Sequence, residues 1–95
     1  MFVVTLKFGP NKERAPALME AHNAWITEGF KSGVFLLTGS LQPKAGGAVL
    51  AHNITREDLE VRMQADPFVV EGVVVPDIIE IAPGRTDERL AFLAA

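Results

Sequence analysis

Hydrophobic and polar residues recur along this chain in two periods, which predict four strands and two helices. Runs of β-branched and aromatic residues mark the strands, and apolar positions spaced three and four residues apart mark the helices. Glycine, proline and asparagine separate these segments. The expected elements are a strand over 2–8, a helix over about 14–32, strands over 35–41 and 48–52, a helix that starts after residue 55 and ends near 65–66, and a strand over 73–81.

This order, βαββαβ, is that of the split βαβ or ferredoxin-like arrangement. We therefore expect an α+β fold in which two helices cover one face of a four-stranded antiparallel sheet. Pro76 cannot donate a hydrogen bond to a neighbouring strand, so the last strand should lie at an edge or carry a bulge. Residues 42–47 are expected to form a turn and 68–72 a short link or one more helical turn. The whole chain, 1–95, is read as a single domain with a C-terminal tail over 85–95.

The composition adds a prediction to this picture: the chain associates with a second copy of itself. Hydrophobic residues make up 48% of the 95 residues, and a chain this short buries a limited share of its surface alone. The predicted fold leaves one face of its sheet bare, and large apolar surfaces usually mark contacts. We therefore expect a homodimer that forms through the sheet face.

Charge and cysteine content exclude several classes of function. The net charge is −3 without a basic run, which argues against nucleic acid as a partner. The chain has no cysteine, and His22 and His52 lack the spacing of a metal motif, so neither a metal nor another cofactor is expected. No apolar run reaches the ~20 residues of a membrane span. The N-terminus lacks the features of a signal peptide, so a cytoplasmic protein is expected.

Two titratable residues are the main candidates for chemistry. His22 falls on the apolar face of the first predicted helix, and its ordinary pKa of about 6.5 suits proton transfer near neutrality. Asp66 precedes Pro67, where the second helix should end, and a carboxylate is unfavourable at a helix C-terminus. The two residues suggest a histidine–aspartate acid/base pair. The alternatives are a core histidine with one hydrogen bond and an aspartate bonded to nearby amides.

Other residues are candidates for substrate binding. Gly39 lies inside a strand, where glycine often marks the close approach of a ligand, and Ser40 beside it offers a hydroxyl group. An exposed strand position is an equally good interpretation of Ser40. Trp25, Phe35 and Phe68 are expected to line an aromatic pocket, although such residues more often form the core. His52 is expected at the surface.

The chain resembles the YCII-related (YciI-like) family over about residues 1–83. The resemblance implies a dimeric α/β barrel of ferredoxin-like subunits and a cofactor-independent enzyme that uses a His–Asp pair, here His22 and Asp66. Elimination of halide from hydroxylated aromatic or quinol-type substrates is one chemistry of this family. Many relatives have proline where this chain has Ser40, so a role for Ser40 is not implied. The segments that carry the resemblance are 2–6, 21–25, 37–41, 46–51 and 65–73, of which Asp66-Pro67-Phe68 followed by Gly72 is the most specific.

Three hypotheses of function follow. The first is a small lyase-like or isomerase-like enzyme that acts on a small organic molecule. The second is a non-catalytic small-molecule-binding or assembly module, in which the His22–Asp66 contact would be structural. The third is an enzyme of the ferredoxin-like monooxygenase or muconolactone-isomerase type. A cavity beside His22 favours the first, whereas a filled core around His22 favours the second.

Overall fold

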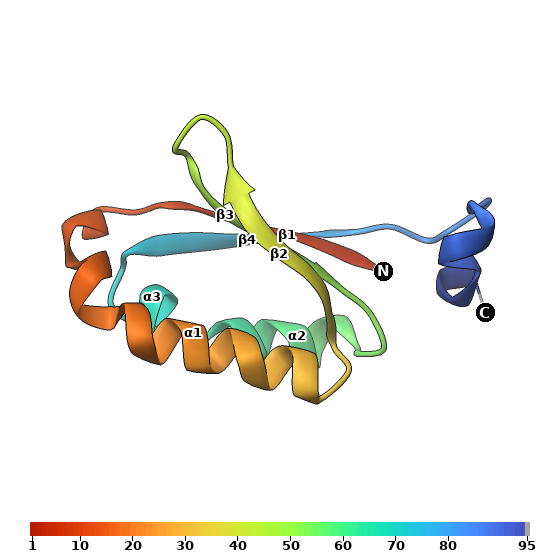
Figure 1. Cartoon of the computed structure of the whole chain (residues 1–95), viewed down its shortest axis with the longest axis horizontal. Coiled ribbons are helices and arrows are strands. Elements are labelled where there is room, and N and C mark those ends of the chain that lie inside the picture. The colour runs from red at the N-terminus through yellow and green to blue at the C-terminus, as the bar shows by residue number, and fades with distance from the viewer. Residues whose placement is uncertain (95) are drawn as a thin grey trace.

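The computed structural model describes residues 1–94 and contains a four-stranded antiparallel sheet with its helices on one side (Figure 1). The strand order is β2-β3-β1-β4, as in the predicted ferredoxin-like α+β fold. β4 pairs only with β1 and so lies at an edge, which is where Pro76 is tolerated. The strands are β1 (Phe2–Phe8), β2 (Phe35–Leu41), β3 (Gly46–Ala51) and β4 (Val74–Glu80).

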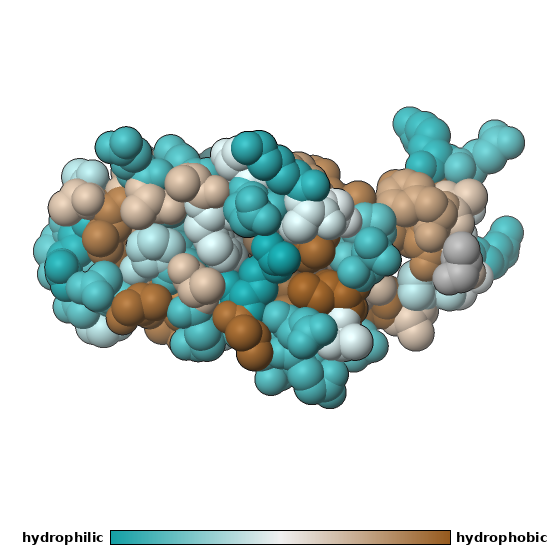
Figure 2. Space-filling model, turned by 90° about the horizontal axis from the view of Figure 1, so that it is seen from below, coloured by the Kyte–Doolittle hydropathy of each residue, from teal (hydrophilic) through white to brown (hydrophobic). Residues whose placement is uncertain are grey.

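The helical layer lies under one face of the sheet (Figure 1). Gly33, with φ of +75°, follows the longest helix and takes the left-handed conformation that the sequence predicted there. Figure 2 shows the helical side from below: hydrophilic side chains cover most of it, and hydrophobic ones form separate patches. The helical elements are η1 (Lys12–Arg14), α1 (Ala15–Lys31), α2 (Arg56–Met63), α3 (Pro67–Val70) and η2 (Glu88–Ala94).

The predicted turn over residues 42–47 is too long, because Gly46 and Gly47 belong to β3. Gly46 pairs with Leu41 on β2 and with Lys7 on β1, so it is held in the sheet from both sides. Its φ is +124°, and a Cβ atom there would lie 2.0 Å from the carbonyl oxygen of Leu6. Only glycine fits this approach, so the residue that looked like a turn signal is a strand residue.

The core lies between the sheet and the helices. β1 and α2 supply five of its twelve residues, whereas Gly29 is the one buried residue of α1. A Cβ atom at Gly29 would lie 2.1 Å from the ring of Phe35, so this glycine lets α1 pack closely on β2. The buried apolar residues are Phe2, Val4, Leu6, Val34, Phe35, Val49, Ala51, Leu59, Met63, Phe68, Val73 and Val74.

A bulge near Leu36 reverses the alternation of β2. Phe35 is opposite Ala51, but Leu37 is opposite Leu50, so β2 has one residue more than β3 at this point. Thr38 is consequently opposite Val49, which is buried on the helix-covered face. The polar residues of β2 beyond the bulge therefore face the helices, and its leucines face the other side of the sheet.

The uncovered face of the sheet carries an apolar row that crosses all four strands. Leu37 is opposite Leu50, Leu50 is opposite Val3, and Val3 is opposite Ile79. Leu37 is 51% exposed and Ile79 is 49% exposed. We refer to these four residues as the apolar row.

The tail leaves the body beyond β4, and its helix η2 lies apart from the other helices (Figure 1). Its Phe92 ring reaches the ring of His52, with centroids 5.5 Å apart, and His52 is half-buried. The last residue of the predicted tail, Ala95, lies outside the described residues. Among the helices of residues 1–94, none combines the length and hydrophobicity needed to cross a membrane.

Candidate active site

A cavity of about 360 Å³ lies between α1 and the helix-covered face of the sheet. The outer ends of β2 and β3 rise away from the helices (Figure 1), and residues of both strands line the cavity. Its volume is at the lower end of the range for small-molecule sites, roughly 300–1,000 Å³. The lining residues are Leu6, Phe8, Ala15, Met19, His22, Asn23, Trp25, Ile26, Thr38, Gly39, Ser40, Gly46, Gly47, Ala48, Val49, Phe68 and Val74.

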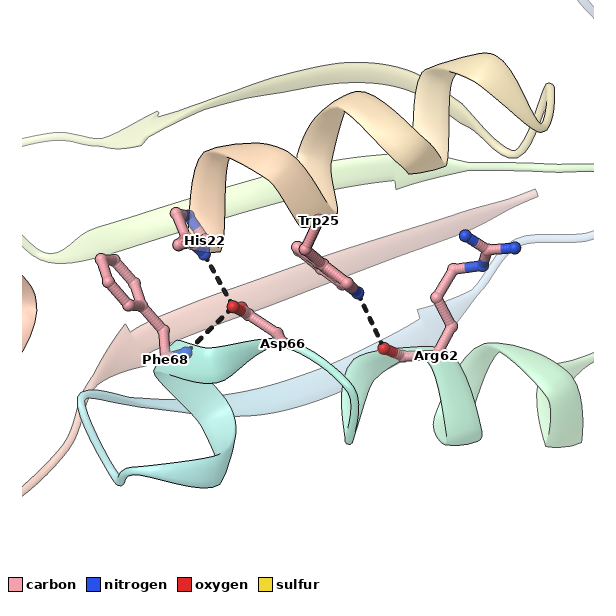
Figure 3. A network of polar contacts seen from close by, with 5 residues as sticks. All are labelled: His22, Trp25, Arg62, Asp66 and Phe68. Carbon is pink, nitrogen blue, oxygen red and sulfur yellow. Dashed lines mark hydrogen bonds and ion pairs between the residues drawn. The ribbon is translucent and has the colours of Figure 1, made fainter. Parts of the chain in front are cut away.

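His22 contacts Asp66 at the wall of this cavity. His22 Nδ1 lies 2.7 Å from Asp66 Oδ1, the distance of a strong charge-assisted hydrogen bond (Figure 3). The Asp66 side chain is fully buried, and that of His22 is 12% exposed. The hydrogen bond through one imidazole nitrogen that the sequence hypothesis required is therefore present.

The partner of Nδ1 determines where the imidazole carries its proton. An ionised carboxylate only accepts hydrogen bonds, so Nδ1 is the donor in this contact when the carboxylate is ionised and the ring is neutral. Nε2 then carries the free lone pair, and it forms no hydrogen bond with any described residue. Since His22 also lines the cavity, it has the arrangement of a general base whose orientation a carboxylate fixes.

Asp66 is positioned by the start of α3 and not by the end of α2. α2 ends at Met63, and Asp66 is the N-cap of α3, with its Oδ1 accepting a hydrogen bond from the backbone N–H of Phe68 at 3.0 Å. Pro67 occupies the first helical position, which favours a helix start. The expected conflict of a carboxylate with a helix C-terminus is therefore wrong, because a carboxylate is favourable at an N-terminus.

The same local segment orients the histidine ring. Phe68 stacks on His22 with ring centroids 3.8 Å apart and planes inclined by 3°. Gly72 ends the segment with φ of +72°, and its carbonyl accepts a hydrogen bond from the backbone N–H of Asn11 at 3.0 Å. The most specific motif of the sequence therefore has a physical explanation: Asp66 caps α3, Phe68 packs on the imidazole, and Gly72 allows the turn back to the sheet.

The second oxygen of Asp66 is left without a partner. Oδ2 is buried and forms no hydrogen bond with the rest of the described chain. A buried acceptor without a partner costs about 1–3 kcal/mol. Both hydrogen bonds of this carboxylate converge on Oδ1, so the contact with His22 is made at the expense of Oδ2. Such a local cost is typical of functional sites.

Four of the five predicted binding residues line the cavity. Trp25 and Phe68 form part of its aromatic wall, and Ser40 faces it from β2. Gly39 contributes backbone only, because its Cβ position faces open space on the uncovered side. Phe35 does not line the cavity: it is buried behind Trp25, with ring centroids 5.2 Å apart in an edge-to-face contact.

Trp25 also joins the two long helices. Its indole Nε1 donates a hydrogen bond to the backbone carbonyl of Arg62 on α2 at 3.0 Å (Figure 3). His22 and Trp25 are three residues apart on α1, so one face of this helix contacts α3 through the imidazole and α2 through the indole. The position of His22 is therefore fixed by both partner helices.

Twelve of the seventeen lining residues were not predicted as site residues, and Thr38, Asn23 and Gly47 are three of them. Thr38 faces the cavity because of the bulge in β2, and no pattern in the sequence predicted this bulge. Asn23 could have been identified from the sequence, because it follows His22 directly and its amide side chain can form hydrogen bonds. Gly47 forms part of the floor: a Cβ atom there would meet nothing nearer than the carbonyl oxygen of Gly39 at 3.4 Å.

Within residues 1–94, no three histidine or acidic side chains gather in a way that could hold a metal ion. His22 and Asp66 form a pair, and within this range no third such side chain lies beside them. His52 lies elsewhere, directly after β3.

Comparison with known proteins shows the fold. The structure is similar to the solved structure of 5-chloro-2-hydroxyhydroquinone dehydrochlorinase from Burkholderia phenoliruptrix AC1100 in complex with 2,5-dihydroxybenzoquinone. The TM-score is 0.71 and the sequence identity 14%, over 87% of this chain and 94% of that protein. No protein-family model matches the chain. No curated protein matches it by sequence.

Proposed function

We propose that this protein is a small cofactor-independent enzyme of the YCII-related type that acts on a small hydroxylated ring compound. The observation that carries the proposal is the 2.7 Å contact between His22 Nδ1 and the buried Asp66, with Nε2 left free at the wall of a cavity. The similar fold of a protein named as a dehydrochlorinase of a hydroxyhydroquinone supports the choice of substrate class.

In this proposal His22 moves the proton and Asp66 positions the ring. Nε2 takes the proton of a ring hydroxyl, and the O–H electron pair becomes the π bond of a carbonyl. In an isomerase-like reaction, the displaced ring electrons take the proton back at a ring carbon. A lyase-like reaction continues from this tautomer: Nε2, which is free again, takes the proton of a second hydroxyl, and a second carbonyl forms. The displaced ring electrons then expel an anionic substituent, such as halide, from the carbon that had taken the first proton.

Asp66 contributes by stabilising the imidazolium that forms when Nε2 takes the proton. The buried carboxylate faces Nδ1, so the positive charge is opposed by a negative one at hydrogen-bond distance. Phe68 fixes the plane of the ring through its stacking contact. General acid–base catalysis of this kind contributes about 10²- to 10⁴-fold in rate.

Chloride release from 5-chloro-2-hydroxyhydroquinone tests this function directly. We expect His22→Ala to lower kcat by about 10²- to 10⁴-fold, the contribution of a general acid–base group. His52→Ala is the matched control, because His52 lies outside the cavity lining, and it should leave kcat unchanged. A His22→Ala variant that releases chloride as fast as the unmodified protein would rule out the role of His22.

The cavity also bears on the non-catalytic alternative. A binding or assembly module would be expected to have a core filled by side chains around His22. The cavity beside His22 therefore supports the enzyme over a module with a filled core.

We further propose that the protein forms a homodimer through the uncovered face of its sheet. The apolar row supports this, because its two end members, Leu37 and Ile79, are about half exposed, and its two inner members are half-buried. Exposed apolar side chains of this size, joined in one row across four strands, mark a surface that another surface covers. Beside this row, Gly39, Ala48, Thr5 and Asp77 form a second row of smaller residues, which would allow a second sheet to approach.

A further inference from the structure

The wall of the cavity carries no permanently charged side chain. Charged residues make up 22% of the chain, yet the lining contains no Lys, Arg, Asp or Glu. His22 is its one titratable member, and the carboxylate that faces His22 is buried behind it. A ligand carboxylate or phosphate that entered this cavity would lose water and find no guanidinium or ammonium group to replace it.

The polar groups of the wall are instead neutral, and two of them, Asn23 and Ser40, belong to exposed residues. The side chains of Asn23, Thr38 and Ser40 line the cavity and form no hydrogen bond with any described residue. Thr38 is half-buried, so its hydroxyl is partly withdrawn from water. Hydroxyl groups both donate and accept hydrogen bonds, which matches the hydroxyl and carbonyl oxygens of a ligand ring.

These groups stand on opposite walls. Asn23 belongs to α1, next to His22, whereas Thr38 and Ser40 are two residues apart on β2 and so share one face of that strand. Apolar side chains, among them Met19 and Val49, line the same cavity. A single ring could therefore lie with its faces against apolar groups and its oxygens toward the polar groups of either wall.

Resting on the proposed function, we propose that this site selects uncharged, hydroxylated single-ring compounds and rejects their carboxylated analogues. Thr38 and Ser40 are its specificity-determining residues: they bind ring oxygens on the wall opposite His22. The cavity volume of about 360 Å³ suits one ring.

Hydroquinone and 2,5-dihydroxybenzoate are the matched probes, because they differ by one carboxylate. Trp25 is the single tryptophan of the chain and lines the cavity, so its indole N–H signal in NMR reports occupancy without any turnover. We expect hydroquinone to shift this signal in a saturable way. We expect 2,5-dihydroxybenzoate to bind at least about tenfold more weakly, because its charge is not paired.

Substitutions on β2 then test the assigned residues. Thr38→Val and Ser40→Ala should each weaken hydroquinone binding by roughly 2- to 13-fold, the net value of one hydrogen bond. Thr5→Val is the matched control, since Thr5 is also a half-buried strand threonine but faces the uncovered side, and it should not change binding. Ser40→Arg should reduce or reverse the preference for hydroquinone over 2,5-dihydroxybenzoate, because the new guanidinium group would pair with the carboxylate.

Three outcomes would overturn the proposal: equal or tighter binding of 2,5-dihydroxybenzoate, no binding of hydroquinone, or unchanged binding in both Thr38→Val and Ser40→Ala. The proposed catalysis fails differently. A protein that binds hydroquinone selectively but releases no chloride from the chlorinated quinol would support the selectivity and contradict the reaction.

Discussion

Beyond its bulge, β2 distributes its side chains in the opposite way from the rest of the sheet, whose buried apolar residues face the helices. In an ordinary half-buried sheet apolar side chains face the covered side and polar ones face water. Beyond the bulge in β2, Thr38 and Ser40 lie under α1, whereas Leu37 lies on the face without helices. Hydroxyls under a helix are useful if a ligand enters there, and leucines on a bare face are useful if another surface covers them.

The same strands therefore serve two surfaces, and each surface should respond to its own substitutions. Changes on the uncovered face should alter the oligomeric state and leave ligand binding intact. Changes on the covered face should do the reverse. The predictions below separate the two faces, beginning with the largest expected effect.

Leu37→Asp should abolish the proposed dimer. In a twofold interface the substitution places two carboxylates among apolar side chains, and an uncompensated buried charge costs about 3–5 kcal/mol. The dimer dissociation constant should rise by more than about 100-fold, as measured by sedimentation at micromolar concentration. Val61→Asp is the control, because Val61 is 71% exposed on α2 and away from the sheet. An unmodified protein that sediments as a monomer would rule out the dimer altogether.

Gly47→Leu should block the cavity while leaving the oligomeric state unchanged. The Cβ atom meets no close contact, so the longer side chain would extend into the space that a ligand needs. Overpacking costs about 1–3 kcal/mol, which corresponds to a roughly 5- to 150-fold loss of hydroquinone affinity. Gly84→Leu is the control, because a Cβ atom there would meet nothing within 4 Å and Gly84 does not line the cavity. Unchanged affinity in Gly47→Leu would show that the ligand binds elsewhere.

Asp66→Ala should destabilise the protein more than Asp66→Asn. Alanine removes the N-cap of α3 and the partner of His22, at a cost of about 1–3 kcal/mol. In a domain of this size each kcal/mol lowers the Tm by roughly 4–8 °C. Asparagine keeps an acceptor for the Phe68 amide and should melt close to the unmodified protein. Equal, large losses in both variants would indicate that the pair is mainly structural.

Gly29→Ala should have the smallest effect on ligand binding and on dimerisation, and it should lower the stability moderately. Its Cβ would lie 2.1 Å from the ring of Phe35, so α1 or the ring must shift. Overpacking of this kind costs about 1–3 kcal/mol in thermal melts. If α1 moves away from β2, hydroquinone affinity should fall with it, whereas the dimer should persist. A variant with unchanged stability would mean that Phe35 relaxes freely.

Most of the fold could be predicted from the sequence because it depends on local periodicity. Five of the seven residues of β1 are β-branched or aromatic and so favour a strand, and Pro76 marks β4 as an edge strand. His22 and Asp66 could also be identified from the sequence, since a histidine on an apolar helix face and an aspartate before a proline are unusual in themselves. The role of Asp66 as the N-cap of α3 could not be predicted, because a four-residue helix that starts at Pro67 is too short for any periodic pattern.

The sequence alone determined which residues form strands and helices, and it singled out His22 and Asp66 as candidates. The tertiary structure decided which of the candidates share a site. The bulge near Leu36 shifts β2 by one residue, and a one-residue shift moves every later side chain to the opposite face. Thr38 and Ser40 consequently face the cavity, while Phe35 remains in the core behind Trp25. Such a shift is set by pairing with β3 and packing against α1, contacts between segments far apart in the chain.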